Sequence, residues 1–212
     1  MRDALRLLNA SARKKAGIVY QSAVPPQRHS PPGKRLRIAV VGHLRQEKDP
    51  FRTALALGYL AKDIEVVQIG DALSPAFARE ANWFMKRDLR YRWLGGCTHS
   101  RALAWIARSH LLVVSSVMEG GANVIAEGAR IGTPVLASRV SGNIGMLGKG
   151  YPGYFPLFDE KALAALIEKY SDRKQYAKLR RSLAARRGLF APAAEKRALL
   201  KQLVDLGARR RA

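Results

Sequence analysis

The chain has 212 residues, with 38 Lys and Arg against 16 Asp and Glu, which gives a formal net charge of +22 at pH 7. This length suits one buried core with appendages, because domains commonly run to roughly 100 to 200 residues. No apolar run approaches the ~18 residues that span a bilayer, and the first residues, "MRDALRLLNASARKK", lack the apolar block of a secretory signal. The single cysteine, Cys97, excludes an internal disulfide. We therefore expect a soluble, cytoplasmic protein.

The positive charge is concentrated at the two ends of the chain. Residues 1–37 hold nine basic side chains against one acid, and residues 171–212 hold thirteen against three. Between them, residues 38–170 hold sixteen basic and twelve acidic side chains, without the interleaved aromatic and basic residues of a single-strand binding platform. We interpret the ends as solvated basic helical segments, and we do not expect nucleic acid to be the main partner.

Residues 1–35 read as the remnant of a preceding domain and a Pro-rich linker. The stretch "ALRLLNASARKKAGIVYQSAV" contains a short helix and a strand-like "GIVYQSA", with nothing before it to supply a neighbouring strand. The segment 22–35, "SAVPPQRHSPPGKR", has four prolines and a glycine, so it forms neither a helix nor a strand interior.

Strand and helix patterns then alternate regularly. Short apolar or β-branched runs predict strands at 36–42, 64–70, 91–95, 111–116 and 134–138. Helical patterns lie between them, with start signals at Asp49-Pro50, at Ser74-Pro75 and near Thr98. This alternation implies right-handed βαβ units. We predict an α/β fold over residues 36–170, a Rossmann-like parallel sheet with helices on both faces.

The remaining chain is predicted to be helical. After the turn-rich "GYPGYFPLF", helical patterns cover about 159–170, 173–187 and 193–206, with no further strand pattern. We expect these segments, including the basic C-terminal helices of residues 171–212, to pack back on the domain.

Ligands of such sheets bind outside the carboxyl ends of the strands. The loops at that edge begin at Gly42, Gly70, Gly95, Ser116 and Ser138.

The fourth of these loops leads into a helix between two glutamates, Glu119 and Glu127, at a Gly-Gly-Ala-Asn step. Unpaired N–H groups at a helix start favour phosphate, but two flanking carboxylates would repel a bare phosphate unless they reach past it to hydroxyls. A sugar nucleotide satisfies both conditions, with Glu119 facing the sugar and Glu127 facing the ribose. Gly120 and Gly121 would let the backbone approach closely, and the N–H groups expected to face the pyrophosphate are those of Gly121, Ala122 and Asn123.

Other loops add candidate residues. Arg45 and Lys48 in "GHLRQEKDP" are cations that could neutralise a departing diphosphate. Gly142, in "SRVSGNIGML", is compatible with a backbone that passes close to a ligand. His43 follows the first predicted strand and Leu94 lies near the end of the third, and these two residues complete the predicted ligand-binding set. The plainer alternative is a capping glutamate, solvated surface charges and a flexible loop.

These motifs together carry a family resemblance. The E-x7-E pair after an apolar strand, the preceding G-x-L-x-x-E-K loop and "GTPVLAS" resemble the donor half of a GT-B glycosyltransferase of glycosyltransferase family 4, over about residues 36–170. The resemblance implies that Glu119 lies by the sugar, Glu127 binds the ribose and Lys48 stabilises the diphosphate. His43 stands where the family usually has an arginine. Either Arg45 compensates for that arginine or the phosphate contact differs.

A narrower resemblance rests on three longer stretches. "VVGHLRQEKDPF", "VMEGGANVIAEG" and "ASRVSGNIGMLGKGYPGYFP" resemble the selenosugar synthases of selenoneine biosynthesis. Those enzymes transfer a sugar, such as N-acetylglucosamine from its UDP donor, to selenophosphate. The resemblance implies a UDP-sugar as donor substrate with no metal or other cofactor. It also implies an N-terminal GT-B half, in cis or in trans, because "ARKKAGIVYQSAVPP" resembles the last strand of such a half running into the interdomain linker.

Two other functions remain open at the level of sequence. One is a GT-B type UDP-sugar epimerase, although the E-x7-E spacing favours a transferase. The other is a noncatalytic module that binds a sugar nucleotide or nucleic acid.

Overall fold

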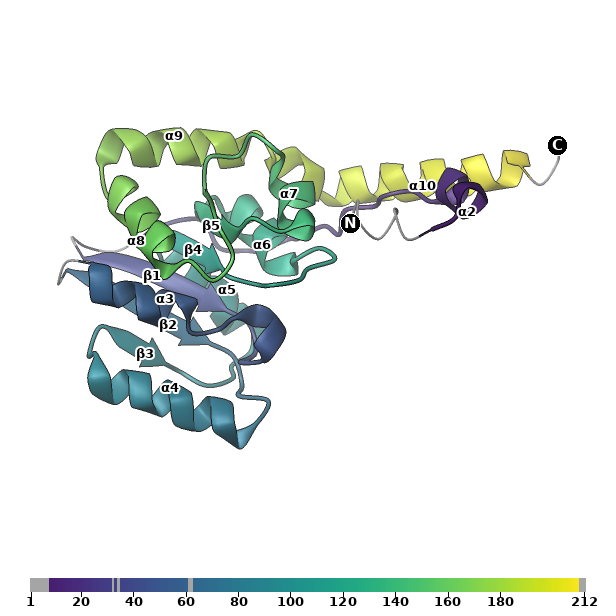
Figure 1. Cartoon of the computed structure of the whole chain (residues 1–212). Coiled ribbons are helices and arrows are strands. Elements are labelled where there is room, and N and C mark those ends of the chain that lie inside the picture. Colours follow the sequence, from purple (N-terminus) through teal and green to yellow (C-terminus); the bar gives the residue numbers. More distant parts are fainter. Residues whose placement is uncertain (1–7, 32, 34, 61–62, 210–212) are drawn as a thin grey trace.

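Six parallel strands form one sheet in the computed structural model, which describes residues 8–31, 33, 35–60 and 63–209 (Figure 1). Their spatial order is β3-β2-β1-β4-β5-β6. The strands are β1 Leu36–Val41, β2 Ile64–Ile69, β3 Tyr91–Trp93, β4 Leu111–Val114, β5 Val135–Ser138 and β6 Tyr154–Phe155. The five predicted strands are confirmed. The sixth lies inside the turn-rich "GYPGYFPLF", where two residues are too few to show a strand pattern.

Helices connect the strands in the alternation that the sequence predicts. They are α3 Arg52–Ala56, α4 Pro75–Arg87, α5 His99–Ala107, α6 Asn123–Ile131, α7 Ser141–Leu147 and α8 Glu160–Lys169. Ser74 caps α4 by accepting a hydrogen bond from the Phe77 N–H, and Thr98 caps α5 by accepting one from the Arg101 N–H. Two of the three predicted helix starts are thus confirmed.

The remaining predicted helix start, at Asp49-Pro50, is wrong. Residues Gln46–Lys48 form a 3₁₀ turn, and Asp49 ends that turn in the left-handed region with φ 44° and ψ 58°. The helix α3 begins at Arg52, and the Asp49 carboxylate accepts from the Arg52 guanidinium at 2.8 Å instead of capping a backbone N–H. Asp49 therefore closes the loop that carries Lys48.

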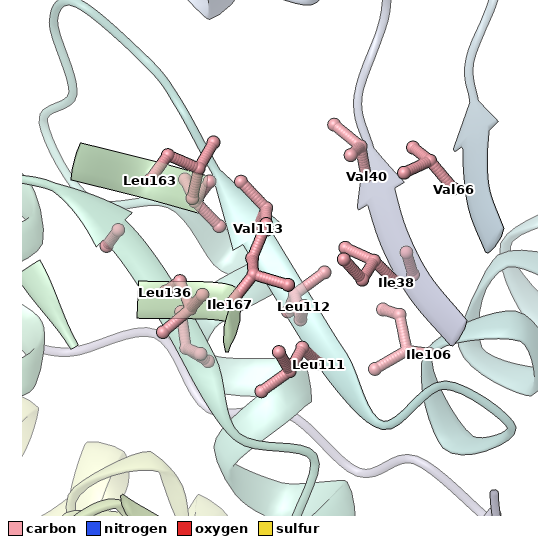
Figure 2. Packing of buried hydrophobic residues seen from close by; sticks show 14 of the residues in the cluster. Ile38, Val40, Val66, Ile106, Leu111, Leu112, Val113, Leu136, Leu163 and Ile167 are labelled. Carbon is pink, nitrogen blue, oxygen red and sulfur yellow. The ribbon is translucent and has the colours of Figure 1, made fainter. Parts of the chain in front are cut away.

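Helices cover both faces of the sheet. Side chains alternate between faces along a strand; accordingly, Val67 and Ile69 of β2 pack with Ala102 of α5, whereas Val66 belongs to the cluster that contains Phe84 of α4. The helices α4 and α5 therefore lie on opposite faces (Figure 1). Figure 2 shows the core between the layers, where buried residues of β1, β4 and β5 meet Ile106 of α5 and Leu163 and Ile167 of α8.

The C-terminal helices are present as predicted, but they do not all pack back. Leu179 and Leu183 bury one side of α9 (Arg173–Ala184) against the domain. The helix α10 (Pro192–Arg209) instead projects from the domain (Figure 1). The segment that follows the N-terminal helix α2 (Ala10–Lys15) contacts α10, because the Ser22 N–H donates to the Glu195 carboxylate at 3.0 Å.

The N-terminal segment, residues 16–31, runs over the domain without joining the sheet. The Ala23 N–H donates to the Phe190 carbonyl at 3.1 Å, the Ser30 N–H donates to the Ala107 carbonyl at 2.8 Å, and the Tyr20 hydroxyl donates to the Gly145 carbonyl. The strand-like "GIVYQSA" has no ladder partner among the described residues. Residues 1–7, 32 and 34 of the predicted remnant and linker lie outside the described residues.

His29 makes the docking of this segment sensitive to pH. Its Nε2 lies 3.1 Å from the Ser109 carbonyl oxygen and 3.2 Å from the Tyr176 hydroxyl. Burial, aided by the nearby charge of Arg180, lowers the pKa of His29 from 6.5 to about 4. Burial also lowers the pKa of His110 beside it. Because folding favours the neutral rings, their contribution to the free energy of unfolding should be complete near pH 7. This contribution should be lost as the pH drops from 6.5 towards 4.

Chemical denaturation at pH 7 and pH 5 tests this expectation. The variant His29→Gln should lose part of that pH dependence, whereas His43→Gln, at a histidine that is 56% exposed, should keep it. If wild type and His29→Gln lost the same free energy of unfolding between pH 7 and pH 5, His29 would not be the source of the pH dependence.

Candidate functional site

A cavity of about 430 Å³ opens at the carboxyl ends of β1 and β4. The chain leaves these neighbouring strands toward opposite edges of the sheet, which is where doubly wound folds form their ligand crevice. The cavity brings together most of the predicted site residues. These are His43, Arg45, Lys48, Glu119, Glu127 and residues 121–123, and His99 lies with them.

The amino end of α6 forms one wall. The helix begins at Asn123 after Ala122, as the Gly-Gly-Ala-Asn step predicts, and no side chain caps it. The first intrahelical bond runs from the Ile125 N–H to the Ala122 carbonyl at 2.9 Å. The preceding N–H groups and the positive end of the helix dipole therefore remain available to an anion in the cavity.

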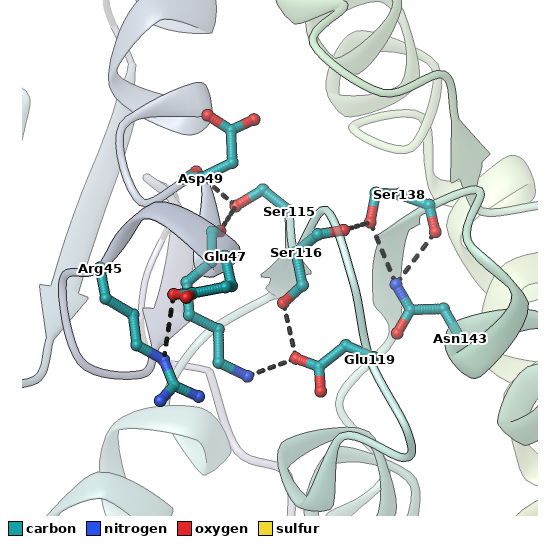
Figure 3. A network of polar contacts seen from close by, with 9 residues as sticks. Arg45, Glu47, Asp49, Ser115, Ser116, Glu119, Ser138 and Asn143 are labelled. Atoms are coloured by element: carbon teal, nitrogen blue, oxygen red, sulfur yellow. Dashed lines mark hydrogen bonds and ion pairs between the residues drawn. The ribbon is translucent and has the colours of Figure 1, made fainter. Parts of the chain in front are cut away.

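Glu119 and Lys48 meet across the cavity from the loops that follow β4 and β1. The Lys48 ammonium forms an ion pair with Oε1 of Glu119, and that oxygen also accepts from the Ser116 hydroxyl at 2.7 Å (Figure 3). The Glu119 side chain is 10% exposed and the Lys48 side chain 24% exposed. The pair places a carboxylate acceptor for hydroxyls next to a cation for phosphate.

Glu127, one turn into α6, pairs with a residue that the prediction does not include. Nε2 of His99 lies 2.8 Å from Oε1 of Glu127. His99 is 72% exposed, whereas the Glu127 side chain is only 15% exposed. A lone histidine at the first position of a helix carries no motif, so only the packing of α5 against α6 reveals this contact.

His43 and Arg45 add two nitrogen donors at the rim. The Asp71 N–H donates to Nδ1 of His43 at 3.1 Å, so a neutral ring carries its proton on Nε2. The Arg45 guanidinium lies 3.9 Å from the Glu47 carboxylate and stays about half exposed. Both side chains line the same cavity as Lys48.

Three predicted residues lie outside the cavity lining. The Leu94 N–H donates to the Gln68 carbonyl, and the Leu94 side chain packs on the cluster of Val67 and Ile69. Gly142 has a structural reason to be glycine, because a Cβ there would lie 1.9 Å from the Glu119 carbonyl oxygen. Gly120 faces open space. Donor contacts by these residues stay predictions.

Two absences can be stated for the described part of the chain. No group of three or more His, Cys, Asp or Glu side chains there is placed to hold a metal ion. No helix in the same part is long and apolar enough to cross a membrane.

The site combines an uncapped helix start, three cationic or N–H donating side chains and two carboxylates around one cavity. The donors suit a diphosphate and the carboxylates suit hydroxyl groups. A nucleoside diphosphate sugar presents these two kinds of group in one molecule.

Solved structures with the same fold include known glycosyltransferases. HepE from Anabaena, in complex with UDP and glucose, matches with a TM-score of 0.72 and 19% identity, over 81% of this chain and 48% of HepE. Sucrose-phosphate synthase from Thermosynechococcus elongatus matches with a TM-score of 0.68 and 21% identity, over 84% of this chain and 47% of the synthase. The apo form of the lipopolysaccharide outer core galactosyltransferase WaaB matches with a TM-score of 0.73 and 16% identity, over 96% of this chain and 58% of WaaB.

The chain thus spans about half the length of these structural neighbours. Its fold is that of a GT-B half, which confirms the Rossmann-like prediction. The family model described as glycosyl transferases group 1 matches residues 24–186, which is most of the chain. The chain therefore belongs to the group 1 glycosyltransferases.

Proposed function

We propose that the chain is the donor-binding half of a family 4 glycosyltransferase and takes a sugar from a UDP-sugar. One observation carries this proposal: Glu119 and Glu127 flank the uncapped start of α6 around a single cavity that also contains Lys48. The E-x7-E spacing favours a transferase over an epimerase, and the match to the group 1 glycosyltransferases favours it over a noncatalytic module.

The proposed chemistry is substitution at the anomeric carbon. An acceptor nucleophile forms the new bond while the bond from that carbon to the β-phosphate oxygen breaks, and UDP departs with the electron pair. Lys48, Arg45 and the start of α6 stabilise the negative charge that grows on the leaving oxygen. His43 adds an Nε2–H donor to the same group. Glu127 accepts from the ribose hydroxyls, and Glu119 accepts from the transferred sugar.

The neighbours support the choice of nucleotide. HepE has been solved with UDP, with UDP and glucose, and with UDP-glucose. Their 19–20% identity to this chain is evidence for the fold, so the UDP-sugar remains a proposal for this protein.

The finer proposal concerns donor and acceptor. The resemblance of three stretches to selenosugar synthases favours UDP-N-acetylglucosamine as donor and selenophosphate as acceptor. In this assignment the reaction belongs to selenoneine biosynthesis and takes place in the cytoplasm.

We further propose that a second, N-terminal Rossmann-like half completes the enzyme, in cis or in trans. Leu199, Leu200, Leu203 and Val204 on α10 are each at least half exposed, and this helix projects beyond the domain (Figure 1). A contiguous exposed apolar helix face marks an interaction surface. We expect the second half to cover apolar surface on the exposed cleft face, and we propose that it covers α10 as well.

The chain alone should bind the donor but not transfer it, because in-line attack needs an acceptor held against the donor and water kept out. Purified chain with UDP-N-acetylglucosamine and selenophosphate should release UDP no faster than a control without the chain, and a separately expressed N-terminal half should raise that release. The double variant Leu199→Lys and Leu203→Lys should bind UDP normally yet fail to respond to the second half. Acceptor-dependent turnover by the chain alone, at roughly 1 to 1000 per second, would contradict the proposal.

A further inference from the structure

Two consecutive serines at the end of β4 connect the loops that carry Lys48 and Glu119. Ser115 and Ser116 follow Val114 directly, and both are almost completely buried, at 2% and 1% exposure. Their hydroxyls point toward different loops (Figure 3). A buried hydroxyl needs a hydrogen-bond partner, and each of these two finds its partner in a loop that lines the cavity.

Ser115 holds the loop after β1. Its hydroxyl lies 2.9 Å from the Lys48 carbonyl oxygen and 2.8 Å from that of Asp49. These carbonyls belong to the end of the 3₁₀ turn, where Asp49 adopts the left-handed conformation that residues other than glycine rarely adopt. The hydrogen bond therefore stabilises a costly backbone geometry at the residue next to Lys48.

Ser116 holds Glu119 itself. Its hydroxyl donates to Oε1, the same oxygen that pairs with Lys48. No side chain or backbone group of the described residues donates to Oε2, so that oxygen is left for a ligand hydroxyl. The Ser116 carbonyl in turn accepts from the buried Ser138 hydroxyl, and the amide of buried Asn143 donates to Ser138 at 3.0 Å. The position of Ser116 is thus fixed from β5 and α7.

We infer that Ser115 and Ser116 are positioning residues of the donor site. Ser116 sets the orientation of the Glu119 carboxylate, and Ser115 sets the loop that aims Lys48, so that sugar recognition and diphosphate recognition are built on one dipeptide. This inference rests on the proposed function, because it assigns Glu119 to the sugar and Lys48 to the diphosphate. A serine that only filled space in the core would act on fold stability and not on ligand selectivity.

Selectivity between ligands separates these roles. For Ser116 the quantity is the ratio of the dissociation constants of UDP and UDP-N-acetylglucosamine, measured by calorimetry. Ser116→Ala should reduce that ratio by about threefold to tenfold and leave the UDP affinity within about twofold. In a Glu119→Ala background, Ser116→Ala should change the ratio no further, because the carboxylate that Ser116 orients is then absent.

Ser115 is tested in the same way with uridine and UDP. Ser115→Ala should reduce the preference for UDP over uridine, and this effect should vanish in a Lys48→Ala background. Ser182→Ala is the matched control, because the Ser182 hydroxyl also donates to a backbone carbonyl but lies on the exposed side of α9. If Ser116→Ala does not fold, Ser116→Cys keeps nearly the same volume with a much weaker donor.

Two results overturn the inference. Unchanged selectivity in folded serine variants is one, and equal losses with and without Glu119 or Lys48 is the other. If wild type binds neither UDP nor the UDP-sugar, the proposed function is wrong, and so is the inference that rests on it. Wild-type binding with an additive cycle overturns the positioning role alone.

Discussion

Replacing Glu127 with alanine should weaken UDP binding by tenfold or more. The ribose offers two hydroxyls to this carboxylate, and a hydrogen bond to a charged acceptor contributes about 1.5 to 3 kcal/mol at most. Glu127 is well suited to the role, because its side chain is largely buried and lies beside the start of α6 in the cavity wall. Isothermal titration of wild type and Glu127→Ala with UDP measures the loss.

Glu168→Ala provides the matched control, because Glu168 is an exposed glutamate of α8 and does not line the cavity. It should bind UDP like wild type. Thermal unfolding of Glu127→Ala must first show a folded protein. Unchanged UDP affinity in that folded variant would mean that the carboxylate does not meet the ribose.

Replacing Lys48 with alanine should weaken UDP much more than uridine. Lys48 pairs with the Glu119 carboxylate and lines the same cavity as the start of α6. A charge-assisted hydrogen bond to a phosphate is about twice as strong as a neutral one, so the loss for UDP should reach about tenfold. Uridine has no phosphate to lose, and its affinity should stay within about twofold of wild type.

Titration of wild type and Lys48→Ala with both ligands measures this difference, and Lys149→Ala, at an exposed loop lysine, is the control. Equal losses for UDP and uridine would point to a damaged fold instead of a lost phosphate contact. Loss of affinity in Lys149→Ala as well would indicate a diffuse charge effect.

The parts of the fold that have a repeating pattern could be predicted. The apolar runs of β1, β2 and β4 are buried on both sides in a parallel sheet, so they read as strands without any knowledge of their neighbours. Glu119 and Glu127 could be found because they flank a glycine step between a strand and a helix, where the chemistry of a sheet edge is concentrated.

Features that depend on tertiary contacts could not be predicted. Asp49 adopts the left-handed conformation and does not start a helix, and its carbonyl accepts a hydrogen bond from Ser115, which is far away in sequence. His99 meets Glu127 only because α5 packs on α6. The contact of Gly142 with Glu119 likewise follows from how α7 lies against the loop after β4. Each pairing joins segments whose separation in sequence obeys no periodicity.

Hydrogen exchange with and without UDP-N-acetylglucosamine tests the central claim most directly, because it shows where the ligand binds. Protection should appear in the loop after β1 around residues 42–49, in residues 115–124 and at the start of α5, which contribute the lining of the cavity. The basic helices α9 and α10 should exchange as they do in the free protein. A donor that leaves those loops unprotected would contradict the account. Protection confined to α9 and α10, together with salt-sensitive retention on DNA, would instead identify a nucleic-acid binding module.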